Sequence, residues 1–199
     1  MSDDALPGRP YQLAAIHGRF QPFHLGHWAY LQEALELADR VIIGITSPLL
    51  LDTPALETRD EQRHLHSNNP FTYFERAEFI LGTLSAAGMQ YAGRVIIVPF
   101  DVSGAAALWP QMIPLDAIML VTPHEPWDEE KSRRFEAAGY RVEMLRTRKD
   151  RITATLVRSR ILRDQDDWQS LVPSGTIQTI KRLALDKRLR NGSRSDHIT

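Results

Sequence analysis

The chain has 199 residues, a formal net charge of −1 and no cysteine. This length suits one domain with a core of its own, and the lack of cysteine excludes a disulfide framework or a Cys-based zinc site. The acidic start at residues 1–4 is followed by no apolar region, and no run reaches the roughly 20 apolar residues that span a bilayer, so we expect a cytoplasmic protein with no membrane partner. The near-neutral charge argues against a nucleic-acid partner.

Five short segments rich in Ile, Val and Leu are typical of strands that are buried on both faces of a sheet. They cover residues 12–17, 40–45, 94–98, 117–121 and 141–145. Helical patterns lie between them. Apolar residues recur at helical spacing over 27–38, a Thr72-x-x-Glu75 capping box starts a helix over 72–84, and a helix over about 128–138 ends before Gly139.

This alternation predicts an α/β fold with a single doubly wound, Rossmann-like parallel sheet and C-terminal helices. We expect an N-terminal arm over residues 1–10, one domain over 11–185, and a polar C-terminal tail over 186–199 that frays. Sheets of this kind bind ligands beyond the carboxyl ends of their strands. Candidate functional residues are therefore sought in the segments that follow the strands.

The connection at residues 47–70 is far longer than the usual loop of about 4 to 6 residues. Loops of this length often act as lids or binding elements, so we predict that this one borders a binding site. A contact between copies of the chain is the alternative. We expect His64 and His66, which lie within it, to be surface residues.

The stretch GRFQPFHLGH at residues 18–27 joins the first predicted strand to the first predicted helix. The start of a helix presents backbone N–H groups without intrahelical partners, which favours a phosphate there. Gly26 allows close approach of a ligand. His24, His27 and Arg19 can all donate hydrogen bonds to phosphate oxygens. By residue type alone, the two histidines could equally be structural residues or metal ligands.

The same stretch resembles the signature of the nucleotidyltransferase superfamily that carries an HxGH motif, in the form found in archaeal-type nicotinamide mononucleotide adenylyltransferases. Two further blocks are similar to that family: NPFTYFER at 69–76, and ITATLVRSRI at 152–161, where Thr153 replaces the family's Ser. WQSLVP at 168–173 is similar to the segment before the family's last helix. The blocks follow the family order over about residues 11–185.

The resemblance implies transfer of a nucleoside monophosphate from a nucleoside triphosphate to a small phosphate- or phosphonate-bearing acceptor, with Mg²⁺ and release of pyrophosphate. It assigns catalysis to His24, His27 and Arg158, and makes the basic stretch 146–163 part of a triphosphate site. The nucleotide-binding residues that it implies are Gly18, Arg19, Phe20, Gly26, Thr153, Thr155 and Arg158, and the acceptor-binding residues are Trp109 and Arg76. Metal ligands stay unassigned, no general base is needed for an ionised acceptor, and homo-oligomer formation is left open.

Two departures from the family concern the acceptor. An Asn that recognises the carboxamide is expected three positions before the stacking aromatic residue, but Ala106 precedes Trp109, for which core packing is the alternative role. A Gly-Asn pair is replaced by Thr122-Pro123. The leading hypothesis is ATP plus nicotinamide mononucleotide giving NAD. A cytidylyl- or adenylyltransferase for another small phosphate or phosphonate, and a non-catalytic nucleotide sensor, are the alternatives.

Overall fold

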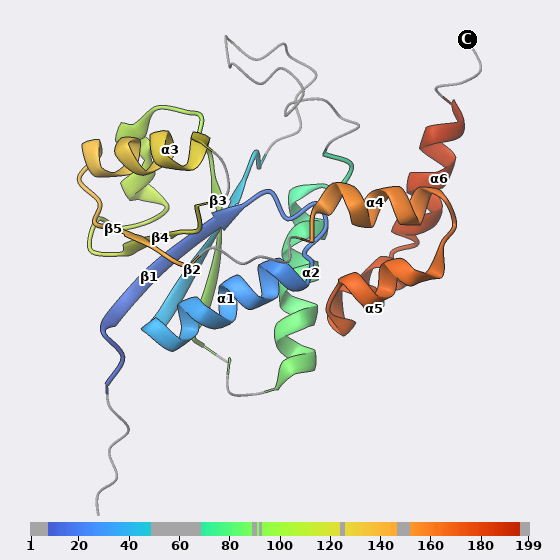
Figure 1. Cartoon of the computed structure of the whole chain (residues 1–199), viewed down its shortest axis with the longest axis horizontal. Coiled ribbons are helices and arrows are strands. Elements are labelled where there is room, and N and C mark those ends of the chain that lie inside the picture. Colours follow the sequence, from blue (N-terminus) through green and yellow to red (C-terminus); the bar gives the residue numbers. More distant parts are fainter. Residues whose placement is uncertain are drawn as a thin grey trace, which may run out of the picture.

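The computed structural model describes residues 8–48, 69–88, 91, 93–123, 126–146 and 152–195. Its sheet has five parallel strands in the order β3-β2-β1-β4-β5. The strands are β1 (Tyr11–Gly18), β2 (Ala38–Thr46), β3 (Val95–Phe100), β4 (Ile118–Val121) and β5 (Val142–Met144). All five predicted strands are confirmed, and so is the doubly wound α/β fold (Figure 1).

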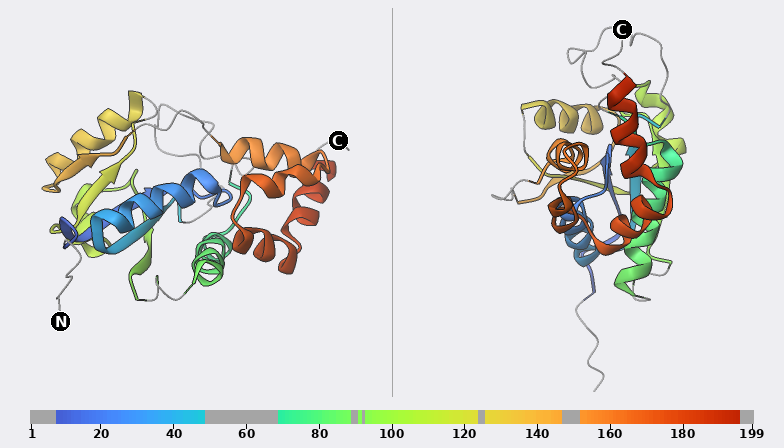
Figure 2. Two further views of the ribbon diagram at one scale, coloured as in Figure 1. Left: turned by 60° about the horizontal axis from the view of Figure 1, so that its bottom comes forward. Right: turned by 90° about the vertical axis from the view of Figure 1, so that its right-hand side faces the viewer.

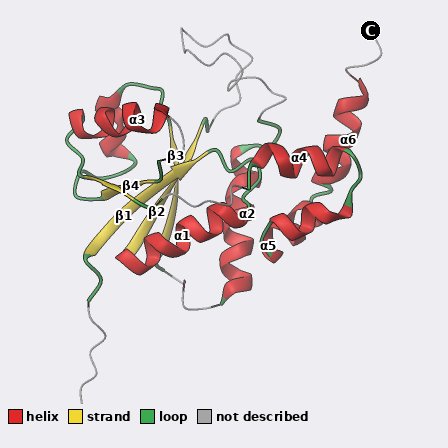
Figure 3. Ribbon diagram, in the orientation of Figure 1, coloured by secondary structure: helices red, strands yellow, loops and turns green. Residues whose placement is uncertain are grey.

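Helices cover both faces of this sheet (Figure 3). The α-helices are α1 (Leu25–Leu37), α2 (Tyr73–Ala87), α3 (Pro126–Ala137), α4 (Ala154–Leu162), α5 (Ser174–Arg182) and α6 (Leu185–Ser195), and the 3₁₀ helices are η4 (Ala106–Gln111) and η5 (Asp166–Leu171). The predicted capping box is present, since the Thr72 hydroxyl accepts from the Glu75 N–H and the Glu75 side chain accepts from the Thr72 N–H. Gly139 follows α3 with a φ of +94°, the left-handed conformation that glycine favours at this position.

Successive residues of a strand contribute to two separate cores, as expected when both faces are buried. On β1, Ala14 and Ile16 pack towards α1 and the C-terminal helices, whereas Ala15 packs towards α3 and η4. On β2, Ile43 belongs to the same core as Ala14, and Ile42 belongs to the same core as Ala15. In two views, α4, α5 and α6 gather beside α2 at one end of the molecule (Figures 1 and 2).

The helices α2 and α5 cross at two glycines. A Cβ atom built on Gly175 of α5 would lie only 2.1 Å from the carbonyl of Gly82 on α2. The backbones of the two helices therefore touch directly, and this close approach holds the C-terminal helices against α2.

The chain passes from α1 into β2 without a connecting loop, because α1 ends at Leu37 and β2 begins at Ala38. The C-terminal end of α1 is capped by two guanidinium groups. Arg9 and Arg94 both donate to the Leu35 carbonyl oxygen, at 2.9 and 2.6 Å, where cations favour the negative end of the helix dipole.

The first ten residues of the predicted tail belong to a helix, α6, which continues to Ser195. Two leucines anchor this helix, since Leu185 is buried in the main core and Leu189 packs against it. The pair of Asp186 and Arg190, 3.0 Å apart, adds an i,i+4 contact. Residues 196–199 lie outside the described part of the chain.

The strand order places a topological switch point between β1 and β4. Ala15 of β1 pairs with Ile42 of β2 on one side and with Met119 of β4 on the other. The chain leads from β1 through β2 to β3 on one side, and then crosses to β4 on the other. Ligands of doubly wound sheets bind at the carboxyl ends of such strands. The segment that follows β1 is GRFQPFHLGH. Within the described residues, no helix has the length and apolar character needed to cross a membrane.

Candidate active site

The turn between β1 and α1 is built around a buried aromatic residue. Phe20 has a φ of +53°, a left-handed conformation that is unusual for a bulky side chain. Its ring is buried and meets the rings of Phe23 and His27 at centroid distances of 5.6 and 4.9 Å. A Cβ on Gly18 would come within 3.0 Å of the Phe20 ring. Gly18 and Phe20, both predicted at the nucleotide site, therefore shape the turn: Gly18 leaves room for the Phe20 ring, and this ring is buried.

His24 and His27 cap the start of α1 for each other. The His24 Nδ1 accepts from the His27 backbone N–H, and the His27 Nδ1 accepts from the His24 backbone N–H, both at 3.3 Å. The two rings stack with their centroids 3.6 Å apart. A neutral imidazole whose Nδ1 accepts a hydrogen bond carries its hydrogen on Nε2. The hydrogen of each neutral ring therefore lies on Nε2.

The electrostatic surroundings keep His27 neutral. Burial lowers its pKa well below the ordinary value of 6.5, and the nearby His24 and Arg19 lower it further, while the Pro22 carbonyl acts weakly in the opposite direction. His27 is thus a neutral donor in the ligand-free protein at neutral pH. A bound anion would favour its protonated form.

Gly26 lies where the turn meets the start of α4. A Cβ at Gly26 would be 3.1 Å from the His24 ring and 3.7 Å from the Ile152 carbonyl oxygen. The N-termini of α1 and α4 therefore approach each other, and both present partly positive backbone N–H groups. A side chain at Gly26 would press against the His24 imidazole, which would have to shift.

The start of α4 carries three of the predicted residues. The Thr153 hydroxyl is the N-cap and accepts from the Leu156 N–H at 3.2 Å. Arg158 donates from Nη1 to the Gln21 carbonyl oxygen at 2.7 Å, and from Nη2 to the Thr155 hydroxyl at 3.4 Å. Burial, and then Arg19, lower the pKa of Arg158 to about 10, so it stays charged at neutral pH.

Arg76 lies deeper than the prediction of an acceptor contact requires. Its side chain is fully buried and donates to the carbonyl oxygens of Thr72, Arg19, Thr46 and Ser47 at 2.7 to 3.2 Å. The last two carbonyls lie at the end of β2. Burial is the largest effect on its pKa, which falls to about 10. This geometry supports a role in holding the strand ends rather than in touching the acceptor.

Arg76 and Arg158 donate to the Arg19 and Gln21 carbonyl oxygens, in the turn that leads to His24. The charge of Arg19 lowers the pKa values of both arginines and of His27. The negative charge of Glu75 raises the pKa of Arg76, but both oxygens of this carboxylate already accept hydrogen bonds from Arg188. Concentrating buried cations in this way is costly without a partner of opposite charge. The site is therefore suited to a polyanion.

Sequence reasoning missed Gln21. Its side-chain amide accepts from the Phe71 N–H at 2.9 Å and donates to the Phe71 carbonyl oxygen at 3.0 Å, within the protein interior. Its own carbonyl accepts from Arg158. Gln21 therefore joins three blocks of the sequence that lie far apart in the chain. The sequence did contain one indication of this role, because Gln21 is a polar residue between the apolar residues Phe20 and Pro22.

Trp109 lies in the core between the sheet and α3, with 2% of its surface exposed. Its ring meets Phe135 edge-on at 5.2 Å and lies 5.8 Å from Phe100, and its indole N–H donates to the Asp101 carbonyl oxygen at 2.9 Å. This placement favours the core-packing alternative. Stacking on an acceptor would require the ring to leave these partners.

The likeness to known enzymes extends over most of the chain. A family model described as cytidylyltransferase-like matches residues 15–80. A phosphonoformate cytidylyltransferase from Streptomyces viridochromogenes is 38% identical over 176 residues, which are 88% of this chain and 94% of that enzyme. The chain belongs to the cytidylyltransferase-like family. It is a nucleotidyltransferase, as its motifs predicted.

Relatives of this nucleotidyltransferase also include adenylyltransferases. A nicotinamide-nucleotide adenylyltransferase from Methanolobus tindarius is 32% identical over 186 residues, 90% of this chain and 93% of that enzyme. A bifunctional NMN adenylyltransferase/ADP ribose pyrophosphatase from Francisella tularensis, solved with AMP and a manganese ion, matches with a TM-score of 0.62 and 19% identity. The match covers 93% of this chain and 53% of that one, so the chain spans about half of it, and the likeness shows the fold.

The nucleotidyltransferase brings most of the predicted site residues together. His24, His27, Gly26, Thr153, Thr155 and Arg158 meet at the facing N-termini of α1 and α4, with Arg19 close to them. Trp109 is not among them. The predicted loop at 47–70 lies outside the described residues except for its ends. Within the described ranges, no group of three His, Cys, Asp or Glu side chains could hold a metal ion.

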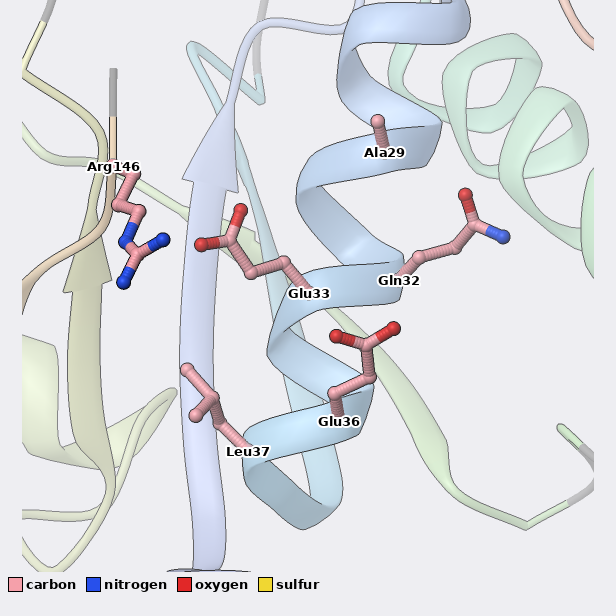
Figure 4. A pocket seen from close by; sticks show the side chains of 6 residues that line it. All are labelled: Ala29, Gln32, Glu33, Glu36, Leu37 and Arg146. Atoms are coloured by element: carbon pink, nitrogen blue, oxygen red, sulfur yellow. The ribbon is translucent and has the colours of Figure 1, made fainter. Parts of the chain in front are cut away.

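A groove of about 530 Å³ runs along α1, and neither His24 nor His27 is among its lining residues (Figure 4). It is lined by Ala29, Gln32, Glu33, Glu36, Leu37 and Arg146. Figure 4 shows Arg146 across the groove from Glu33. Two carboxylates against one guanidinium suit a triphosphate poorly, so we do not assign the nucleotide to this groove.

Proposed function

We propose that this nucleotidyltransferase moves a cytidylyl group from CTP to a small phosphonate, with release of pyrophosphate. The observation that carries the choice of acceptor is the burial of Trp109, whose ring and indole N–H are used by the core. Ala106, which begins η4, offers no amide to recognise a nicotinamide. The 38% identity to a phosphonoformate cytidylyltransferase supports the same choice.

In this proposal, the residues at the facing N-termini of α1 and α4 bind the phosphates of the triphosphate. A phosphonate oxygen attacks the α-phosphorus, a new P–O bond forms, and the bond to the pyrophosphate oxygen breaks in line. The Nε2–H groups of His24 and His27 donate to oxygens whose negative charge grows in the transition state, and Arg158 holds the departing pyrophosphate. Each well-placed donor contributes about 3 to 4 kcal/mol. The acceptor is ionised at neutral pH, so no general base is assigned.

Mg²⁺ is part of this proposal as the divalent cation of the reaction. The described residues provide no ready set of three ligands, and Mg²⁺ is often held chiefly by substrate phosphates and water. The manganese ion in the Francisella tularensis structure supports the use of a divalent cation in this fold. When bound with the triphosphate, the ion would share the negative charge with Arg158 and the two histidines.

A second candidate is ATP plus nicotinamide mononucleotide giving NAD. Its support is the set of blocks GRFQPFHLGH and NPFTYFER, together with the 32% identity to the Methanolobus tindarius adenylyltransferase.

The two candidates separate in one screen of pyrophosphate release. Each of the four nucleoside triphosphates is tested against phosphonoformate, a simple alkylphosphonate, nicotinamide mononucleotide and nicotinate mononucleotide, with Mg²⁺. We expect the highest kcat/KM with CTP and a phosphonate. A preference for ATP with a pyridine mononucleotide would contradict the proposal and establish the second candidate.

A further inference from the structure

The C-terminal helix α6 contacts the first turn of α2 and the residues after the C-terminal end of α4 through two arginines. Arg188 binds Glu75 in the first turn of α2, and Arg190 binds Asp164, which follows α4 within two residues, at 2.6 Å. Neither arginine belongs to the motifs that define the family resemblance.

The contact made by Arg188 has two parallel hydrogen bonds. Nη1 donates to Glu75 Oε1 at 2.5 Å, Nη2 donates to Glu75 Oε2 at 2.7 Å, and Nη2 also donates to the Pro70 carbonyl oxygen at 2.9 Å. Most surface ion pairs contribute little, but bidentate geometry with a buried carboxylate is the exception. The Glu75 side chain is 11% exposed and that of Arg188 is 46% exposed.

Glu75 is already committed to the start of α2. Its Oε2 accepts from the Thr72 N–H at 2.9 Å, which closes the capping box. Burial raises the pKa of Glu75, but hydrogen bonds from Arg188 and from the Thr72 backbone outweigh it and leave the pKa below the ordinary value. The carboxylate is thus kept charged by the helix start and by α6 together.

The segment held by this contact leads directly to the phosphate site. Phe71, next to Pro70, is joined by two hydrogen bonds to the Gln21 side chain, and the Gln21 carbonyl accepts from Arg158. Arg76, next to Glu75, holds the carbonyls of Arg19 and Thr46. The hydrogen bonds of Phe71, Gln21 and Arg76 in these two paths join buried or half-buried groups, and the remaining links are between neighbouring residues of the chain.

We propose that Arg188 is a positioning residue for nucleotidyl transfer: its bidentate contact with Glu75 fixes residues 70–76, and these fix the turn that carries His24 and His27. It touches no reacting atom in this role. The first turn of α2 and the turn after β1 act as one rigid unit only while α6 is docked. This inference uses the phosphate site and does not depend on which base or acceptor is used.

The test compares Arg188→Ala with a matched control, Arg182→Ala. Arg182 lies on α5 and also binds a glutamate of α2, since its Nη2 lies 2.5 Å from Glu78 Oε2, but the side chains are 55% and 25% exposed. Misalignment by about 1 Å can cost up to a hundredfold in rate. We expect Arg188→Ala to lower kcat about tenfold with KM for the triphosphate changed less than threefold, Arg188→Lys to recover part of the loss, and Arg182→Ala to stay within twofold of the wild type.

Amide hydrogen exchange gives a readout that does not need turnover. Arg188→Ala should speed exchange at the Phe71 and Thr72 amides, because these donate to the side chains of Gln21 and Glu75 in the segment that Arg188 holds, whereas Arg182→Ala should not. If no acceptor supports turnover, the proposed function fails, and the exchange data still test the role of Arg188. Wild-type kcat and unchanged exchange in Arg188→Ala, or equal losses in both variants, would overturn the inference.

Discussion

The two sides of the active site differ in how their side chains are used. On the phosphate side, His24, His27 and Arg158 are held by hydrogen bonds to groups of the turn after β1. On the side of η4, Trp109 is buried in the core, and its indole N–H donates to the Asp101 carbonyl oxygen. The residues expected to bind the phosphates are thus held in place by the fold, whereas the region of η4, where the acceptor was expected to bind, differs from the family pattern.

Removing the donors on the phosphate side should have the largest effect. We expect His24→Ala and His27→Ala each to lower kcat by about a hundredfold or more. Because both histidines also cap α1, His24→Asn and His27→Gln are the sharper variants, since Asn and Gln preserve the cap at these positions. These two should lose similar activity while the melting temperature stays near that of the wild type. Near-normal turnover in either of them would remove that histidine from the reaction.

Arg158 should affect one substrate more than the other. We expect Arg158→Lys to raise KM for the triphosphate about tenfold or more, because Lys cannot replace a two-pronged donor, and to leave KM for the acceptor within threefold. Steady-state kinetics with each substrate varied in turn measures both values. Equal losses for both substrates would mean that Arg158 organises the Gln21 turn as a whole instead of holding pyrophosphate.

Trp109 tests the other side of the comparison. If it is a core residue, Trp109→Phe should lower the free energy of unfolding by about 1 to 3 kcal/mol, because the Asp101 carbonyl loses a buried donor. The KM for the acceptor should then stay within twofold. Urea unfolding and acceptor kinetics on the same preparation decide the matter, and a large rise in KM with unchanged stability would restore the stacking role.

The smallest expected effect concerns the protonation of His27. Because burial lowers its pKa below 6.5, the folded protein binds fewer protons there than the unfolded chain as the pH falls below 6.5, and stability is lost in that direction. Nitrogen chemical shifts of the ligand-free protein should show His27 neutral at pH 6.5, with the hydrogen on Nε2. A protonated ring at that pH would contradict the cap geometry, in which Nδ1 accepts.

Local patterns in the sequence were sufficient for the strands and for the turn after β1. The run of apolar residues around Ala15 and the capping box at Thr72 are short-range signals that the structure confirms. Contacts between distant residues were not predictable in this way. Arg188 and Glu75 are 113 positions apart, so nothing in either neighbourhood indicates their pairing.

The burial of residues whose types usually lie at the surface could not be predicted from the sequence either. The family resemblance implied that Arg76 meets the acceptor, but its guanidinium donates to backbone carbonyls at two strand ends. The tail 186–199 was expected to fray because of its polar composition, yet residues 186–195 belong to α6, in which Leu185 is buried and Leu189 packs against the core. In both cases the deciding partners come from other elements.

The direct passage from α1 into β2 makes α1 a spacer of fixed length. One extra residue within Leu25–Leu37 would turn the following part of the helix by about 100°, and no loop exists to absorb the change before Ala38. Either the two histidines would rotate away from α4, or every side chain of β2 would exchange one face of the sheet for the other. Insertions in natural or engineered versions of this enzyme should therefore be tolerated after β2 but not between His27 and Ala38.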